Sequence, residues 1–345
     1  MSVWEYLEER VSAAIASAEP AAFDALALPV FQFQREHNLP YAQYCRSLGT
    51  PAQPADWRAI PAVPQAAFKH AALRAFPEAE ETARFLTSGT TGEGRGVHHF
   101  RSMRLYDEAI LRGWDLLEMP ALPHILLIPS PGEAPHSSLS HMMGVLRARA
   151  AGGGQSWCVH PDTGLDVPRL RELMNGFIDA RQPVLLLGTA LAFLHWFEAP
   201  GAPLALPAGS MAFETGGYKG AGRSLTKSGL YHQFHRRLGL DADCIVNEYG
   251  MTELSSQCYT RGLGSTHAAP PWMRVLVVDP ATGCEVADGE TGLLRIYDLA
   301  NLGSVMGIQT RDMAIRRGGD FELLGRDPAA LPRGCSRAAD EMLTS

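Results

Sequence analysis

The stretch Thr87-Ser-Gly-Thr-Thr-Gly-Glu-Gly-Arg-Gly96 is the most informative part of this sequence. It combines four glycines with four hydroxyl side chains and ends on a cation followed by glycine. Glycines let backbone N–H groups turn inward around an anion, and hydroxyls and a guanidinium add donors. The pattern predicts a polyphosphate-binding loop, although a plain surface turn has a similar composition. The residues expected at the phosphates are Thr87, Ser88, Gly89, Thr90, Thr91, Gly92 and Arg95.

This loop differs from the P-loop of nucleoside triphosphatases, whose pattern is G-x-x-x-x-G-K-[ST]. Gly89 and Gly94 have the P-loop spacing, but Arg95 replaces the lysine and Gly96 replaces the Mg²⁺-binding hydroxyl. The order Thr-Ser-Gly-Thr-Thr-Gly, then Glu-Gly-Arg-Gly, instead resembles the phosphate loop of adenylate-forming enzymes. That superfamily includes acyl-CoA synthetases, luciferases and peptide-synthetase adenylation domains. Its usual tail is Pro-Lys-Gly, so Gly94 and Arg95 depart from the pattern.

Composition excludes several other classes of protein. The 345 residues are 46% hydrophobic and carry a net charge of −7, without a basic run, so a nucleic-acid surface is not expected. Six cysteines are scattered singly, which disfavours structural zinc and a disulfide framework and favours reduced, cytoplasmic thiols. The N-terminus is acidic and unlike a signal peptide. The most apolar segment, Pro183 to Phe197, is too short to span a membrane.

Apolar periodicity predicts an α/β fold. Helices are expected over 2–48, 102–117 and 167–180, and buried strands over 124–130, 183–188, 210–217 and 243–250. Buried strands separated by helices favour a mostly parallel sheet, with ligands beyond the strand carboxyl ends. Residues 50–66, rich in Pro and Ala, are expected to be a connector. Antiparallel strands are expected over 273–279 and 292–299, with a hairpin over 314–325.

Two further segments resemble adenylate-forming motifs. Asn247-Glu-Tyr-Gly-Met-Thr-Glu253 is similar to Tyr-Gly-x-Thr-Glu, and Glu214-Thr-Gly-Gly-Tyr is similar to the Gly-rich strand end that precedes it. On residue type alone, each is equally an ordinary loop or turn. The resemblance implies that Tyr249 packs on adenine, Thr252 bonds the α-phosphate and Glu253 holds Mg²⁺. The other nucleotide-site residues that it implies are Gly216, Gly217, Asn247 and Gly250.

The resemblance also implies a ribose site near the end of the sequence. Asp312 matches the superfamily's Thr-Gly-Asp motif, and a carboxylate can accept hydrogen bonds from both ribose hydroxyls. Arg326 matches the residue just before the hinge and is implied to reach the same ribose. Arg311 replaces the usual glycine. A lone Asp or Arg is more often a solvated surface charge, so these assignments depend on the ordered set of motifs.

Within the superfamily, the sequence most resembles LuxE-type acyl-protein synthetases. The similar segments are Val63-Pro-Gln-Ala-Ala-Phe-Lys69, Pro135-His-Ser-Ser-Leu, Phe213-Glu-Thr-Gly-Gly-Tyr-Lys-Gly and Arg333-Gly-Cys-Ser336. The resemblance implies the large-domain fold without the small C-terminal lobe, because the lysine-bearing lobe of other members has no counterpart in 327–345. The expected division is an α/β nucleotide- and acyl-binding region over 1–272, a β-rich region over 273–326, and a tail over 327–345.

The resemblance implies a two-step reaction. A carboxylic acid, expected to be fatty, reacts with ATP and Mg²⁺ to give acyl-AMP, and the acyl group then moves to Cys335 for delivery to a partner such as an acyl reductase. Arg333 and Arg337 flank Cys335 and would favour its thiolate. The other five cysteines are expected to be small core residues. Two alternatives stay open: a stand-alone ligase that passes acyl-AMP to CoA, a carrier protein or an amine, and a degenerate nucleotide-binding module.

Overall fold

The computed structural model describes residues 1–87, 94–151, 156–216 and 226–326. Contacts between residues divide the chain into two compact units, each built from several segments. Unit 1 comprises Met1–Leu117, Thr252–Cys258 and residues 267–326, whereas unit 2 comprises Glu118–Met251 and Tyr259–Thr266. The division expected from the sequence, 1–272, 273–326 and 327–345, follows chain order instead.

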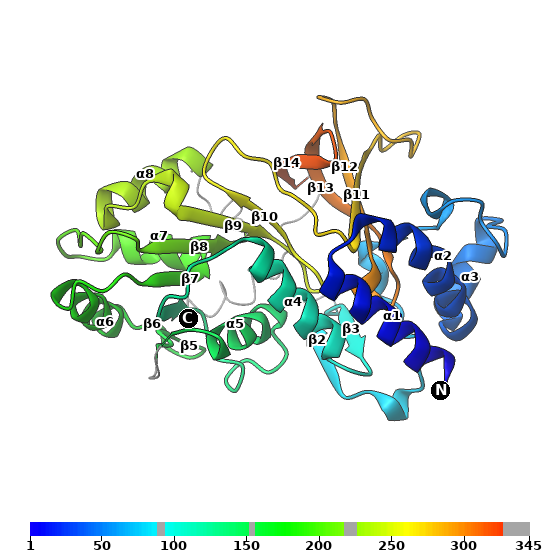
Figure 1. Cartoon of the computed structure of the whole chain (residues 1–345), viewed down its shortest axis with the longest axis horizontal. Helices are drawn as coiled ribbons and strands as arrows, with labels where there is room; N and C mark the ends of the chain where they lie inside the picture. Colours follow the sequence, from blue (N-terminus) through cyan, green and yellow to red (C-terminus); the bar gives the residue numbers. More distant parts are fainter. Residues whose placement is uncertain (88–93, 152–155, 217–225, 327–345) are drawn as a thin grey trace. The chain divides into compact units, whose positions relative to one another are not determined.

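The α-helices in the described residues of unit 1 are α1 (Val3–Ser17), α2 (Pro20–His37), α3 (Leu39–Ser47) and α4 (Arg104–Leu116). The helical region predicted over 2–48 is therefore confirmed but is divided into three. Ala18 adopts a left-handed conformation that ends α1, and the Asn38 side chain caps α3 by accepting from the amide of Tyr41. In Figure 1, α1 lies against α2 and α4, which bury its apolar face.

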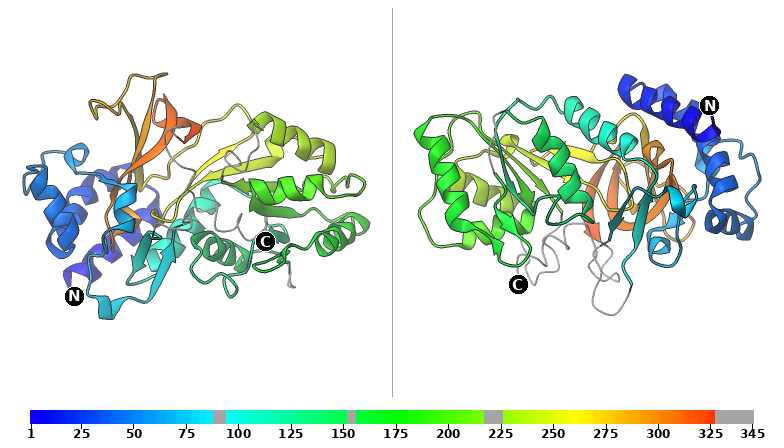
Figure 2. Two further views of the ribbon diagram at one scale, coloured as in Figure 1. Left: turned by 180° about the vertical axis from the view of Figure 1, so that it is seen from behind. Right: turned by 90° about the horizontal axis from the view of Figure 1, so that it is seen from below.

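The strands of unit 1 form a five-stranded, mostly antiparallel sheet and a separate hairpin. The sheet has the order β1 (Val63–Pro64), β13 (Gly307–Arg317), β12 (Thr291–Asp298) and β11 (Met273–Val278), and β14 (Asp320–Arg326) also pairs with β13. Both predicted antiparallel pairs are confirmed, and β1 shows that the expected connector contributes a short strand. Figure 2 shows β13 and β14 at the orange-red end of the colour scale. The hairpin joins β2 (Ala83–Leu86) to β3 (Val97–Phe100).

Unit 2 contains the predicted parallel sheet. Its order is β10 (Cys258–Arg261), β9 (Ile245–Tyr249), β8 (Met211–Thr215), β7 (Leu185–Thr189) and β4 (His124–Leu127), with β4, β7, β8 and β9 parallel. In the part of unit 2 that the structure describes, the sheet is accompanied by α5 (Ser138–Ala148), α6 (Val167–Asp179), α7 (Ala190–Glu198) and α8 (Lys227–Leu238). A small hairpin joins β5 (Val159–His160) to β6 (Gly164–Leu165).

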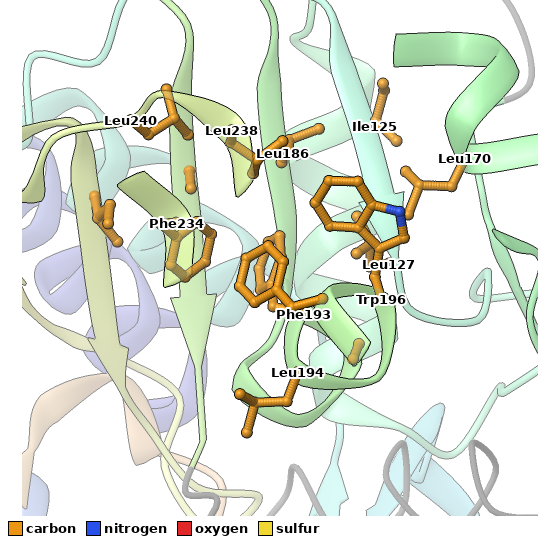
Figure 3. Close-up of a cluster of buried hydrophobic side chains, with 14 of the residues drawn as sticks. Ile125, Leu127, Leu170, Leu186, Phe193, Leu194, Trp196, Phe234, Leu238 and Leu240 are labelled. Carbon is orange, nitrogen blue, oxygen red and sulfur yellow. The ribbon is translucent and has the colours of Figure 1, made fainter. Parts of the chain in front are cut away.

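The core of unit 2 lies between this sheet and its helices (Figure 3). Leu170 of α6, Phe193 and Trp196 of α7, and Phe234 of α8 pack with Ile125, Leu127 and Leu186 of the strands. Burial of these large side chains stabilises unit 2 by about 2 kcal/mol each.

No helix within the described ranges is both long and apolar enough to cross a bilayer. Of the five cysteines in those ranges, Cys45, Cys158 and Cys258 are buried as expected, and Cys244 is partly buried. Cys284 is exposed, so its assignment to the core was wrong, because it lies in the turn between β11 and β12, where the chain reverses at the surface.

Candidate functional site

The two ends of the expected phosphate loop are joined at the top of the β2–β3 hairpin. The Thr87 amide donates to the Gly96 carbonyl at 2.9 Å, and the Gly96 amide donates to the Thr87 hydroxyl oxygen at 2.7 Å. A Cβ on residue 96 would lie 3.0 Å from Thr87 Oγ1 and Cγ2, so only glycine fits there without displacement. The acceptor role of the Thr87 hydroxyl is therefore structural, while Arg95, next to this junction, is exposed.

Several expected site residues lie outside the described residues. They are Ser88, Gly89, Thr90, Thr91 and Gly92 of the phosphate loop, Gly217, and Cys335.

Glu253 lies in unit 1 and is almost completely buried, at 4% exposure. Its Oε1 accepts a hydrogen bond from Nε2 of Gln65 at 3.1 Å. Burial raises the pKa of Glu253 to about 7, although the Gln65 hydrogen bond and the charge of Arg326 lower it, and Asp312 raises it. The carboxyl of Glu253 and the Asp312–Arg326 pair are therefore close enough to interact electrostatically.

Asp312 and Arg326, both expected at the ribose, are direct partners. They oppose each other in the antiparallel β13–β14 pair, and Arg326 Nε donates to Asp312 Oδ1 at 3.2 Å. The Asp312 side chain is 11% exposed and that of Arg326 is 22% exposed. Pairing of a guanidinium with a largely buried carboxylate limits the rotation of that carboxylate. An oriented acceptor of this kind is suited to a pair of vicinal hydroxyls.

Three buried side chains hold the segment 252–256, and sequence reasoning did not identify them as site residues. His98 Nδ1 donates to the Thr252 carbonyl at 2.8 Å, and Asn301 Nδ2 donates to the Glu253 carbonyl at 2.9 Å. The Asp298 carboxylate accepts from the amides of Ser255 and Ser256 at 3.0 and 2.8 Å. No local pattern in the sequence connects these residues, since they are separated by 40 or more positions from the segment they hold.

The other motif residues lie in unit 2, near the carboxyl ends of β8 and β9. Gly216 follows β8 with φ +79°, a conformation that favours glycine. Asn247 Nδ2 donates to the Glu214 carbonyl at 3.4 Å, so this side chain joins the two strands. Tyr249 is buried at 7% exposure, and Gly250 is partly buried. Thr252, the next motif residue, belongs to unit 1 and is buried.

The buried carboxyl groups of Glu214 and Glu248 lie at these strand ends, and neither residue was predicted to belong to the site. Glu248 accepts a hydrogen bond from the Thr215 hydroxyl, and Glu214 accepts one from the Tyr231 hydroxyl at 3.3 Å. Burial raises the pKa of each carboxyl to about 7. In β8 and β9, Glu214 is paired with Asn247 and Thr215 with Glu248, so the two carboxyls project from opposite faces of the sheet.

The donor set of unit 1 fits a hard cation bound together with phosphate. Within the described parts of the chain, no group of three His, Cys, Asp or Glu side chains could hold a metal by itself. Mg²⁺ commonly takes one or two carboxylates and completes its shell with substrate phosphates and water. The Glu253 carboxylate suits that arrangement, and its Oε1 accepts a hydrogen bond from the neutral amide of Gln65.

Comparison with known proteins identifies the fold. Neither a protein-family model nor a curated protein sequence matches this chain. Among solved structures, ATP-bound MatB from Rhodopseudomonas palustris is similar with a TM-score of 0.52 and 17% identity, over 71% of this chain and 48% of MatB. The chain thus spans about half the length of MatB.

Two other solved structures are similar to this chain. A 2-hydroxyisobutyryl-CoA ligase in the postadenylation state, in complex with 2-HIB-AMP, has a TM-score of 0.64 and 15% identity, over 89% of this chain and 68% of the ligase. McyG A-PCP complexed with phenylalanyl-adenylate has a TM-score of 0.52 and 14% identity, over 72% and 47%. Together with the mixed parallel and antiparallel sheets, these similarities show that the chain has the α/β fold of adenylate-forming ligases.

Proposed function

We propose that this protein activates a carboxylic acid with ATP, releasing pyrophosphate and forming acyl-AMP. The observation that carries the proposal is the group in unit 1 formed by Glu253, Asp312 and Arg326. These residues match three separate motifs of adenylate-forming enzymes, and the fold brings them within electrostatic range of one another. The ligands named for the similar structures, ATP and acyl adenylates, support the same reaction class.

In this proposal the residues of unit 1 bind and orient the nucleotide. Asp312, held by Arg326, accepts hydrogen bonds from the ribose hydroxyls, and Arg95 adds positive charge beside the phosphate loop. Glu253 holds Mg²⁺, which supplies charge neutralisation at the phosphates. An oxygen of the substrate carboxylate attacks the α-phosphorus, and the bond to pyrophosphate breaks. Positioning and electrostatic stabilisation account for the acceleration, and no side chain becomes covalently modified in this step.

The acceptor of the acyl group is a second part of the proposal, and it depends on the LuxE-type resemblance. The Cys335 thiolate attacks the acyl carbon of acyl-AMP, AMP leaves, and a thioester remains for delivery to a partner such as an acyl reductase. The positive side chains Arg333 and Arg337 favour the thiolate form. A fatty acid is the substrate class that the resemblance suggests.

The acceptor is tested by labelling the protein with ATP and radioactive carboxylic acid. Wild-type protein should carry a hydroxylamine-labile label, and Cys335→Ser should lose it while retaining ATP–pyrophosphate exchange, because activation does not need the thiol. Cys284→Ser is the matched control, since Cys284 is exposed and has no proposed role. A label that persists in Cys335→Ser would remove this cysteine from the mechanism. Exchange without labelling in the wild type would favour the stand-alone ligase.

The non-catalytic alternative, a degenerate nucleotide-binding module, is motivated by Arg95 and Arg311, which replace a lysine and a glycine of the usual motifs. ATP binding without carboxylate-dependent exchange would support it. Restoring the motif with Arg95→Lys separates the two interpretations further: in an active enzyme this change alters the rate, whereas in an inactive module it leaves exchange undetectable.

A further inference from the structure

Two side chains from other parts of unit 1 donate hydrogen bonds to consecutive backbone carbonyl groups, those of Thr252 and Glu253. His98, on β3, donates to the carbonyl of Thr252 at 2.8 Å. Asn301, in a 3-10 turn after β12, donates to the carbonyl of Glu253 at 2.9 Å and to that of Val305 at 3.2 Å. Both side chains are 1% exposed, so neither hydrogen bond competes with bulk water. Two adjacent peptide groups are thus fixed from two separate parts of unit 1.

We propose that His98 and Asn301 are positioning residues that fix the Thr252–Glu253 backbone and thereby aim the Glu253 carboxylate at the metal–phosphate group. The inference rests on the proposed function only through the assignment of Glu253 to the metal. It adds two residues that none of the motifs contains.

The surroundings of His98 determine its chemistry. Its ring packs against Phe68 and Phe100, with centroid distances of 5.7 and 4.2 Å, and burial lowers its pKa to about 4. The imidazole is therefore neutral at physiological pH. Since a carbonyl can only accept, Nδ1 must carry the proton, which fixes one tautomer and one ring orientation. A neutral donor also adds no positive charge near a carboxylate that is proposed to bind a cation.

The segment after Glu253 is fixed as well, which makes the two hydrogen bonds part of a larger set. Asp298 accepts from the amides of Ser255 and Ser256 and from the Ser256 hydroxyl, at 3.0, 2.8 and 2.8 Å. Gln65 then contacts the carboxylate of Glu253 itself. Hydrogen bonds within the protein therefore hold both the backbone and the side chain of this segment, which is the arrangement expected where a ligand must meet a preorganised group.

The test is the gain in ATP affinity that Mg²⁺ provides, measured by calorimetry as the ratio of the Kd in EDTA to the Kd in Mg²⁺. His98→Phe preserves a flat ring but removes the donor, and it should reduce this ratio about fivefold, the equivalent of one hydrogen bond, with the EDTA Kd unchanged. His98→Gln retains a donor and should restore most of the ratio. Asn301→Leu should act as His98→Phe does.

The control is His99→Phe, at the neighbouring position of the same strand. His99 is similarly buried but pairs with Glu81 at 2.7 Å, so its loss should leave the Mg²⁺ ratio unchanged. A folded His98→Phe with the wild-type ratio would overturn the proposal, as would an equal loss in His98→Gln. If neither His98→Phe nor Asn301→Leu folds, hydrogen exchange of the wild-type 252–256 amides decides: slow exchange supports a fixed segment, and fast exchange refutes it.

ATP binding is measured without turnover, so the test of the positioning role is independent of the pyrophosphate-exchange test of the proposed function. A wild-type protein that binds ATP more tightly with Mg²⁺ but exchanges no pyrophosphate would refute carboxylate activation and leave the positioning role standing. A wild-type protein whose ATP affinity does not depend on Mg²⁺ would refute the positioning role.

Discussion

Replacing Glu248 with glutamine is expected to raise the free energy of unfolding more at pH 8 than at pH 5. Glu248 is buried on β9, where its carboxyl accepts from the Thr215 hydroxyl. Burial raises its pKa from 4.5 to about 7. A carboxyl whose pKa is higher in the folded than in the unfolded protein releases its proton less readily on the folded side. The contribution of the protonated Glu248 carboxyl to stability is therefore complete at pH values below its pKa in the unfolded protein. This contribution is lost as the pH rises through its pKa in the folded protein.

The size of the effect follows from these two pKa values. The pKa of Glu248 is 4.5 in the unfolded and about 7 in the folded protein. Relative to the protein with Glu248 protonated, linkage lowers the free energy of unfolding of the wild type by about 1 kcal/mol at pH 5 and about 3 kcal/mol at pH 8. Glutamine does not titrate and retains an oxygen that can accept from Thr215. The difference between variant and wild type should therefore grow by about 2 kcal/mol between the two pH values.

The assay is urea denaturation at pH 5 and pH 8, followed by far-ultraviolet circular dichroism. Glu172→Gln on α6 is the matched control, because the Glu172 side chain is 71% exposed and its replacement should give the same small difference at both pH values. If Glu248→Gln differs from wild type equally at pH 5 and pH 8, the carboxyl titrates normally, and the reasoning from its burial is refuted.

Three further predictions concern unit 1. Glu253→Gln should fold normally and slow ATP–pyrophosphate exchange by about 2–4 kcal/mol of barrier; a wild-type rate at equal Mg²⁺ would remove Glu253 from the metal. Asp312→Ala should weaken ATP binding by about 1.5–3 kcal/mol and reduce the preference for ATP over its 2′,3′-dideoxy analogue, and an unchanged preference would show that this carboxylate does not contact the ribose. Gly96→Ala should cost about 1–3 kcal/mol of stability in thermal unfolding, because its Cβ would lie 3.0 Å from Thr87, whereas Gly94→Ala meets nothing within 4 Å. Equal melting temperatures of these two variants would contradict the close approach at residue 96.

Much of the secondary structure could be predicted from local sequence. The parallel strands are continuous apolar runs, and β7 and β8 are buried at every position, which makes them visible without an alignment. The amphipathic helices α4 and α6 were found by their 3.6-residue period. In contrast, α7 was missed because Ala190–Glu198 continues the apolar run of β7 without a breaker and is buried almost all round. Periodicity cannot separate a buried strand from such a helix.

The candidate site could be predicted only where motifs name its residues. Glu253, Asp312 and Arg326 were expected together because each belongs to a recognisable motif, and the structure places them in one unit. His98 and Asn301 could not be found in this way, and Gln65, although it lies in the LuxE-like segment Val63–Lys69, was given no role there. Gln65 and Glu253 are 188 positions apart, and Gln65 directly follows β1, which pairs with β13 in a non-local contact that no periodicity reveals. Asp312 lies in the middle of β13, an 11-residue strand.

The central claim is that the protein activates a carboxylic acid with ATP, and carboxylate-dependent ATP–pyrophosphate exchange tests it most directly. Purified wild-type protein, Mg²⁺, ATP and labelled pyrophosphate are incubated with a panel of fatty, aryl and amino-acid-derived carboxylic acids, with Glu253→Gln as the matched negative control. The proposed function predicts incorporation of label into ATP that depends on at least one acid, is greatest for a fatty acid, and falls sharply in Glu253→Gln. Tight binding of MgATP with no exchange for any acid in the panel would contradict it.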